Sequence, residues 1–451
     1  MLVFASLTHY CTACVRFPPN NDNDVLPRMP VHPTTLISCH ECGLLQRTVS
    51  IAPGVTARCG RCGAGLYRAR TNGIERSLML IVSSFILFVL ANSFPFMSFS
   101  VEGREQVSTL LTGVFVLYEN GLWSLALVVF LASVALPLLK ITLMAYVLLP
   151  LYLGRQPPHG ALVFRWAEIS RPWAMMEVFL LGVLVAYVKL GDLGTLKLGV
   201  SVFAFSALIL VIVAADAVLD PHEVWERLAL EDPQNLHAPG PDDMLVGCHA
   251  CDLVNPVPAH DHGHHDCARC GAALHWRKTD SIARTWALVI TAFILYIPAN
   301  AYPIMTVISF GKGAPDTIIS GVIHLIEAGL WPLALLVFVA SIAVPMLKLV
   351  GLSYLLVSVQ RGSVWRLKDK TVLYRIIEAV GRWSMIDIFM ISILVALVNL
   401  GSVATIEPGV GAISFAAVVI ITMIASMMFD PRLMWDNLEK RQKTDLVHAH
   451  G

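Results

Sequence analysis

A twenty-residue apolar segment occurs twice in this chain, 208 residues apart, with 14 identical positions. The first copy is Gly121–Lys140 and the second is Gly329–Lys348. Each copy is long enough to cross a bilayer, and each carries a proline followed three residues later by a lysine. A lysine deep in an apolar helix costs free energy unless it is paired or reaches water. Two such segments in register therefore predict a membrane protein built from two copies of one unit.

The composition agrees with a membrane protein. Only 14% of the 451 residues are charged, and 56% are hydrophobic, whereas soluble domains contain about 25% charged residues. The formal net charge is zero. The first 35 residues lack a basic stretch followed by an apolar core, so we expect no cleavable signal peptide and assign targeting to the first apolar span.

Four apolar stretches recur in each half of the chain. The predicted membrane spans are 78–96, 122–151, 173–190, 200–219, 286–307, 330–357, 384–400 and 412–429. LANSFPFM at 90–97 matches PANAYPIM at 298–305, and RPWAMMEVFLLGVLVAYVKLG at 171–191 matches GRWSMIDIFMISILVALVNLG at 381–401. Because four spans per unit is an even number, the two units have the same orientation.

The ten cysteines all fall in C-x-x-C pairs, and four pairs form two larger groups. The metal ligands predicted from them are Cys39, Cys42, Cys59 and Cys62, and then Cys248, Cys251, Cys267 and Cys270. Sixteen residues separate the pairs of the first group and fifteen those of the second, a spacing typical of four-cysteine zinc ribbons. We therefore predict two zinc sites, one per ribbon. The alternative is a thiol-redox pair, which needs only one C-x-x-C.

Two smaller features near the ribbons stay open. Cys11 and Cys14 have no second pair nearby in the polar tail, and we interpret them as a stray pair in a flexible leader. The second ribbon's loop carries four histidines, which are either spare metal ligands or solvated residues: His260, His262, His264 and His265.

The fold predicted from these patterns is an all-α polytopic membrane protein with two parallel repeats, each a small zinc ribbon followed by four transmembrane helices, eight in total. The predicted domains are a disordered N-terminal tail 1–35, ribbon 36–72, membrane block 73–221, linker 222–245, ribbon 246–279, membrane block 280–431 and C-terminal tail 432–451.

Positive charges are distributed unevenly between the predicted loops. The loops after the second span of each half hold nine of them: Arg155, Arg165, Arg171, Arg361, Arg366, Lys368, Lys370, Arg375 and Arg382. The opposite loops hold only Arg104, Lys197 and Lys312, with Lys189 at an edge. The positive-inside rule therefore places both ribbons, the linker and both termini in the cytoplasm.

Ionisable and polar residues inside the predicted spans are the main candidates for function. In the second half they are Ser341, Lys348, Ser384, Asp387 and Thr422; in the first half they are Lys140, Glu177 and Asp216. Lys140 would face Glu177, and Lys348 would face Asp387, on neighbouring spans. Each pair is either a static ion pair that fixes helix packing or a site whose protonation changes during a transport cycle.

The sequence contains no phosphate-binding Gly-Lys loop, no H-E-x-x-H and no nucleophile elbow, so we predict a protein that is not an enzyme.

The ribbons together with the segments PANAYPIM, EAGLWP, VPMLK and RWSMIDIF resemble the paraquat-inducible protein A family, from about Cys39 to about Trp435. The resemblance implies a multi-pass protein of the bacterial inner membrane that works with a periplasmic partner built from MCE domains. It also implies that the chain loads phospholipid into that partner's tunnel, or receives it, without nucleotide hydrolysis. The five polar residues of the second half match the positions expected to matter in that family. No nucleic-acid partner is implied.

Three other functions remain compatible with these patterns. A stand-alone proton-coupled transporter of a small solute would use the same repeats and buried charges. A membrane-bound thiol oxidoreductase would use the C-x-x-C pairs, and a scaffold would keep the charges static.

Overall fold

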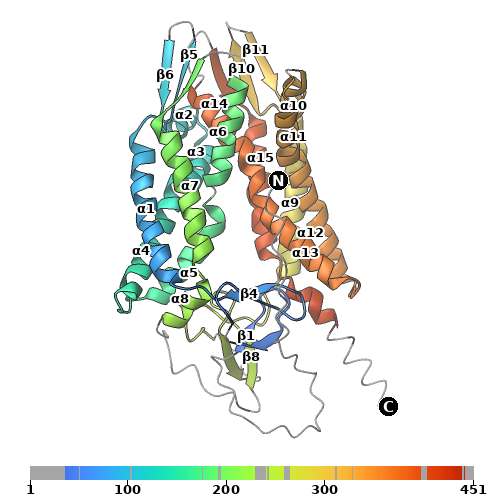
Figure 1. Cartoon of the computed structure of the whole chain (residues 1–451). Helices are drawn as coiled ribbons and strands as arrows, with labels where there is room; N and C mark the ends of the chain where they lie inside the picture. Colours follow the sequence, from blue (N-terminus) through green and yellow to red (C-terminus); the bar gives the residue numbers. More distant parts are fainter. Residues whose placement is uncertain are drawn as a thin grey trace.

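The computed structural model describes residues 36–438 and 441, apart from 50, 102–103, 175, 191–194, 229–239, 241–242, 259–264, 310–311, 328 and 398–403. The predicted tail 1–35 with Cys11 and Cys14 lies outside these residues, and so do His260, His262 and His264. The described residues form a helical body with small β-structures at both ends (Figure 1).

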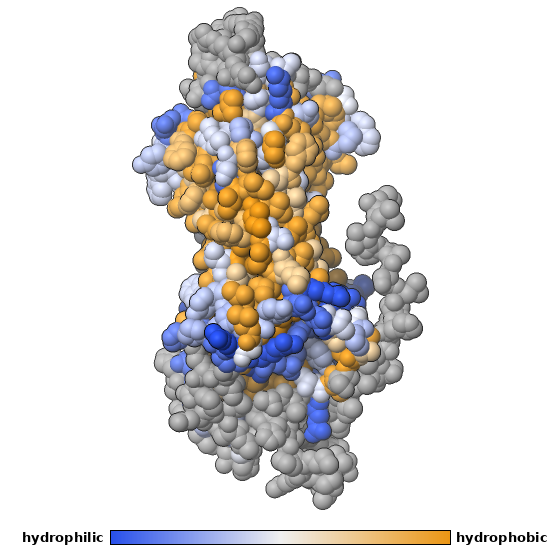
Figure 2. All heavy atoms as spheres, turned by 60° about the vertical axis from the view of Figure 1, so that its left-hand side comes forward, coloured by the Kyte–Doolittle hydropathy of each residue, from blue (hydrophilic) through white to orange (hydrophobic). Residues whose placement is uncertain are grey.

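Six described helices are long and apolar enough to cross a membrane. They are α1 (Gly73–Ser93), the continuous helix Trp123–Tyr152, α7 (Val200–Val218), α9 (Ser281–Ala301), the continuous helix Trp331–Gln360 and α15 (Val410–Met428). Their exposed surface carries large apolar side chains such as Leu210 and Ile297. Figure 2 shows these apolar atoms gathered around the waist, between two more polar ends. This distribution is that of a multi-pass membrane protein.

Within the described residues, the helix in the third predicted span of each half is shorter than the span. The helices there are α6 (Met176–Leu190) and α14 (Ile386–Leu397), with 15 and 12 residues. Each follows a 3-10 turn, η3 (Arg171–Trp173) or η6 (Gly381–Met385), which takes up the residues expected to begin the span. At 1.5 Å per residue these helices are about 22 and 18 Å long. The expectation of eight full-length spans is therefore not met by the described residues.

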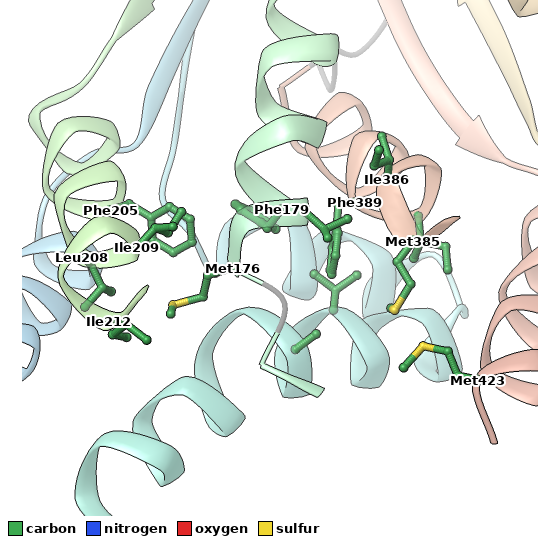
Figure 3. Packing of buried hydrophobic residues seen from close by; sticks show 14 of the residues in the cluster. Met176, Phe179, Phe205, Leu208, Ile209, Ile212, Met385, Ile386, Phe389 and Met423 are labelled. Atoms are coloured by element: carbon green, nitrogen blue, oxygen red, sulfur yellow. The ribbon is translucent and has the colours of Figure 1, made fainter. Parts of the chain in front are cut away.

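The two short helices pack against each other in the centre of the molecule. The rings of Phe179 on α6 and Phe389 on α14 lie 5.4 Å apart, and Phe179 also contacts Phe205 of α7 at 5.5 Å. A Cβ on Gly182 would lie 3.0 Å from the Phe389 side chain, so the glycine permits this close approach. Figure 3 shows these aromatic side chains between α7 and α14, where the ring pairs meet edge to face. A short helix that is largely buried by protein need not match the bilayer thickness.

The all-α prediction is wrong at the end opposite the ribbons. Two antiparallel three-stranded sheets lie there, with strand orders β6-β5-β7 and β11-β10-β12 (Figure 1). Their strands are β5 (Met97–Val101), β6 (Arg104–Ser108), β7 (Thr195–Leu198), β10 (Met305–Ser309), β11 (Lys312–Asp316) and β12 (Ala404–Pro408). Met97 pairs with Ser108 and Leu198 in one sheet, and Met305 pairs with Asp316 and Pro408 in the other. Short helices α2 (Thr112–Glu119) and α10 (Ile318–Glu327) follow these strands.

Each half repeats the same order of elements. In both halves the first long helix packs along the last one, α1 with α7 and α9 with α15. The middle long helix consists of α3 (Trp123–Phe130), a π-helical segment and α4 (Leu136–Tyr152) in the first half. In the second half it consists of α11 (Trp331–Phe338), a π-helical segment and α12 (Val344–Gln360). A helix on the ribbon side follows, α5 (Gly160–Ser170) or α13 (Leu367–Val380).

The ribbon end is built from short antiparallel strand pairs. These are β1 (Leu36–Ser38) with β2 (Leu45–Arg47), β3 (Thr56–Arg58) with β4 (Gly65–Arg68), and β8 (Asp243–Gly247) with β9 (Val254–Pro258). Ile37 of the first ribbon bridges to Leu253 of the second, so the two ribbons touch. Helix α8 (Pro221–Arg227) lies beside them (Figure 1).

Candidate functional site

Two clusters of four buried cysteines lie at the ribbon end, and they contain the eight ligands predicted from the sequence. Within each cluster all sulfur atoms lie within 4.8 Å of one another. The Sγ–Sγ distance is 3.5 Å for Cys39–Cys62 and for Cys248–Cys270. A tetrahedral Zn²⁺ with Zn–S bonds of about 2.3 Å would hold its ligands about 3.8 Å apart. The donors and their spacing therefore fit a tetrahedral metal ion such as zinc.

The chemistry of the clusters also fits a metal better than a redox pair. None of the eight described cysteines forms a disulfide. The neighbouring Cys39 sulfur, together with burial, raises the pKa of Cys42, and the Cys248 sulfur does the same for Cys251. Four thiolates packed this closely repel one another, and a bound divalent cation removes that repulsion.

Tight turns shape each C-x-x-C pair. The residue after each second cysteine has a positive φ: Gly43 at 72°, Gly63 at 74°, Gly271 at 60° and Asp252 at 57°. The Gly43 N–H donates to the Cys39 carbonyl at 2.8 Å, and the Gly63 N–H donates to the Cys59 carbonyl at 2.9 Å. At three of these four positions the residue is glycine, which adopts a positive φ without strain.

The cysteine cluster of each ribbon contacts the membrane block of the other half. Arg375, on α13 of the second half, donates from Nε to Glu41 of the first ribbon at 2.6 Å and from Nη2 to the Cys62 carbonyl at 3.4 Å. Arg165, on α5 of the first half, donates to the Cys270 carbonyl of the second ribbon at 3.0 Å. Arg165 and Arg375 are at equivalent positions in the two halves. The sequence places each ribbon before its own block and does not reveal this crossing.

The other end of each ribbon is bonded to its own half. The Arg68 N–H donates to Asp220 Oδ2 at 2.6 Å, and the Lys278 N–H donates to Asp430 Oδ2 at 3.2 Å. Both aspartates belong to the Asp-Pro motif that follows the last span of each half. Each ribbon therefore bridges the two halves. Trp435, placed by the sequence in the C-terminal tail, is buried beside the first ribbon, and Arg61 lies over its ring.

Among the candidate intramembrane charges whose side chains the structure describes, Lys348 is the most deeply buried, with 1% of its surface exposed. Its Nζ donates to Thr422 Oγ1 on α15 at 2.9 Å. No carboxylate among the described residues forms an ion pair with it. Ser341 lies in the π-helical segment Val339–Ala343 one heptad before Lys348, and its buried hydroxyl has no hydrogen-bond partner in the described part of the chain. π-Helical segments within α-helices occur frequently at functional sites.

The two other predicted residues of this group are only partly described. Ser384 lies in η6, and Asp387 lies in the first turn of α14. Their side chains are outside the described part of the structure. The structure thus brings Lys348 and Thr422 together, while the pairing of Lys348 with Asp387 stays a prediction.

The lysine of the first half has a different partner from the one expected. Lys140 donates to Asp216 of α7 at 2.6 Å, with Arg171 3.7 Å from the same carboxylate oxygen. Glu177, the expected partner, is exposed at the start of α6. Asp216 lies in the last turn of α7, two residues before its end at Val218, and its carboxylate meets Lys140 of α4. The sequence places these residues in spans but does not say which spans are neighbours.

Known proteins resemble the chain over most of its length. The family model described as paraquat-inducible protein A matches residues 74–229 and again 282–439. The chain is 33% identical to the intermembrane transport protein PqiA of Escherichia coli (strain K12) over 413 residues, which cover 90% of this chain and 96% of that protein. It is 29% identical to the lipophilic envelope-spanning tunnel protein A of the same strain, over 88% of this chain and 90% of that protein.

A third relative is the probable intermembrane transport protein of Haemophilus influenzae, which is 27% identical over 89% of this chain and 96% of that protein. No solved structure matches the chain.

Proposed function

Because the chain belongs to the paraquat-inducible protein A family, we propose that it is the inner-membrane subunit of a system that moves phospholipid between the two membranes of a bacterial envelope. The names of its relatives support a role in intermembrane transport and describe transport proteins rather than enzymes. In this proposal the chain loads lipid into a periplasmic tunnel of MCE domains, or receives lipid from it.

The proposed arrangement has two parallel repeats, each with one zinc ribbon and four membrane segments. The recurring order of elements and the two matches of the family model support it. The third of the four segments in each repeat is the short internal helix, α6 or α14. Both ribbons, the linker and both termini face the cytoplasm, and the two sheets face the periplasm, in agreement with the distribution of positive charges. The predicted domain boundaries, 36–72, 73–221, 222–245, 246–279 and 280–431, stay part of this proposal.

The observation that carries the proposal is the buried Lys348 in its hydroxyl environment. A buried ammonium held by a hydroxyl is poorly stabilised compared with an ammonium in an ion pair. Lys348, Asp387, Ser341, Ser384 and Thr422 form, in our proposal, a polar site in the second half whose protonation changes while lipid moves. Such a site would let a proton gradient across the membrane drive lipid movement in a chain without a nucleotide-binding motif, because proton affinity changes when an amine and a carboxylate approach or separate.

The test is the double variant Asp387→Asn and Lys348→Met, expressed at normal level in the native host. We expect loss of envelope protection, measured as survival in detergent, because no group in this pair then exchanges a proton. Thr142→Val is the matched control, since the Thr142 hydroxyl is exposed and bonds only to carbonyls of its own helix. Full protection by the double variant would overturn the coupling. Uptake of a small solute by partner-free vesicles would instead favour a stand-alone transporter.

A further inference from the structure

A cavity of about 680 Å³ lies between the two halves on the ribbon side of the molecule. Ile212 and Asp216 of α7 line one wall, and Met423 and Ser426 of α15 line the other. Figure 3 shows Ile212 on one side and Met423 on the other, with Met176 of α6 between them. We call this cavity the chamber. Since Asp216 corresponds to Ser426 in the repeat, the chamber lies where equivalent surfaces of the two halves meet.

The chamber is lined by charges of both signs. Three cationic side chains, those of Lys140, Arg171 and Arg375, line it together with three carboxylates, those of Glu177, Asp216 and Glu378. A lining of one sign would favour a purely anionic or a purely cationic ligand. Charges of both signs in one cavity are complementary to a ligand that carries a phosphodiester and an ammonium together.

An apolar groove of about 570 Å³ adjoins the chamber. Its lining is almost entirely apolar and includes Leu181 and Leu184 of α6, Val202 of α7 and the exposed ring of Trp383. Glu177 lines both the chamber and the groove, so the two hollows meet at this residue. The groove then follows α6 to Tyr187 and reaches Leu198 of β7 at the sheet end.

The length of the groove matches one leaflet of a membrane. The ten steps from Glu177 to Tyr187 rise about 15 Å along α6. This is half of the hydrocarbon core of a bilayer, which is about 30 Å thick. If the headgroup lies in the chamber, the groove therefore accommodates an acyl chain over the depth of one leaflet. The acyl chain would point away from the ribbons.

We propose that the chamber and the groove form a binding site for one zwitterionic glycerophospholipid, with the headgroup in the chamber and an acyl chain along α6. Lys140 and Arg171 face the phosphodiester, and Glu177 and Glu378 face the ammonium. The site adjoins the polar site of the second half, because Gly381 lines the chamber and a Cβ there would lie 3.0 Å from Lys348 Nζ. The inference rests on the proposed lipid-transport function and adds the place and the headgroup class.

The experiment uses the full-length chain in vesicles of phosphatidylethanolamine and phosphatidylglycerol. A photo-crosslinking residue replaces Leu184, which lines the groove and is 53% exposed. The control position is Leu210 on α7, which is 71% exposed and outside both hollows. Mass spectrometry identifies the captured lipid. We expect phosphatidylethanolamine to be enriched about tenfold at Leu184, the preference that one charge-assisted hydrogen bond supplies. At Leu210 the captured lipids should match the vesicle composition.

Two variants test the chamber itself. Lys140→Met combined with Asp216→Leu removes both members of the ion pair, and Arg171→Gln removes a cation with a partly exposed side chain. Either variant should abolish the enrichment at Leu184 and leave capture at Leu210 unchanged. Equal compositions at the two positions would mean ordinary surrounding lipid and would overturn the inference. Enrichment of phosphatidylglycerol, or full competition by millimolar inorganic phosphate, would overturn it as well.

The outcomes separate this inference from the proposed function. If Leu184 shows no enrichment while Asp387→Asn with Lys348→Met still abolishes envelope protection, only the chamber site is wrong. If Leu184 is enriched and that double variant protects fully, the site stands and the proposed proton coupling is wrong.

Discussion

Lys140 and Lys348 end the two copies of one twenty-residue segment, yet different groups surround them. Lys140 donates to the carboxylate of Asp216, whereas Lys348 donates to the hydroxyl of Thr422. The residues at equivalent positions of the two halves explain the difference. The second half has Ser426 where the first half has Asp216, and the first half has Ile212 where the second half has Thr422. An ion pair that satisfies its lysine is suited to hold helices together, and a lysine held by a hydroxyl is suited to change its protonation.

Lys140→Met should therefore destabilise the protein, because Asp216 loses its closest cation. Breaking a buried pair costs roughly 3–5 kcal/mol, and we expect about 3 kcal/mol since Arg171 still reaches Asp216. Adding Asp216→Leu should recover more than half of the loss, as thermal unfolding in detergent would show. Lys348→Met should cost less than Lys140→Met. An equal loss for the two lysines would contradict their assignment to different roles.

Glu168 provides a prediction about pH. It lies on α5, outside the six long helices, and burial raises the pKa of its carboxyl, with Arg171 opposing. A raised folded pKa means that the folded protein holds this proton more tightly than the unfolded chain. The tighter binding of this proton therefore stabilises the folded protein at pH values below the pKa of the unfolded chain, near 4.5. This stabilisation is lost as the pH rises through the pKa of the folded protein.

Glu168→Gln removes this pH dependence. The difference in Tm, variant minus wild type, should increase as the pH is raised from 4 to 7. Asp369→Asn is the control, because Asp369 is exposed on α13. A difference that is constant over this pH range would contradict the raised pKa.

At the residue scale the sequence predicts chemistry better than contacts. The C-x-x-C spacing identified all eight clustered cysteines, because the ligands of a knuckle are close in the chain. The repeat identified Lys140 and Lys348. The partner of Lys140 was missed because Asp216 is 76 residues away, and hydropathy does not say which helices are neighbours.

At the scale of elements, the crossed ribbons join the two halves. Arg375 links the first ribbon to α13, and Arg165 links the second ribbon to α5. Loss of the metal from one ribbon should therefore loosen the helix of the other half. Because the metal supplies most of the folding energy of so small a module, removing two ligands unfolds it locally.

Hydrogen exchange on ribbon variants tests this crossing. Cys59→Ser with Cys62→Ser should increase exchange in 367–380, with 160–170 little changed. Cys267→Ser with Cys270→Ser should do the reverse, so each variant is the matched control of the other. Bound zinc should fall from two ions to one in each variant. Increased exchange confined to the ribbon's own half would contradict the crossing.

The elements themselves were predicted unevenly. The long helices follow from apolar runs, since a run of about 20 residues has few alternatives in a chain of this composition. The three-stranded sheets were missed, because strands of four or five residues in short polar loops leave little periodicity. The third spans were predicted to begin at 173 and 384, whereas α6 and α14 begin at Met176 and Ile386, because hydropathy does not separate a 3-10 turn from the first turn of an α-helix.

At the scale of the whole molecule, the metal clusters, the chamber and the sheets follow one another from one end to the other. The ribbons hold the two halves together below the chamber, and the groove leads from Glu177 toward the β7 end. This order agrees with the proposed transfer of lipid from the bilayer to a partner at the sheet end. In our proposal the second copy of the duplicated segment carries the polar site, and the first copy contributes the Lys140–Asp216 ion pair at the chamber.

The most direct test of the central claim is purification of the chain from its native membrane in mild detergent, with mass spectrometry of everything that co-purifies. Our account predicts an MCE-domain protein and bound phospholipid, together with two zinc ions per chain. A well-folded, zinc-loaded preparation without the MCE-domain protein and without phospholipid would contradict the account and favour a stand-alone transporter.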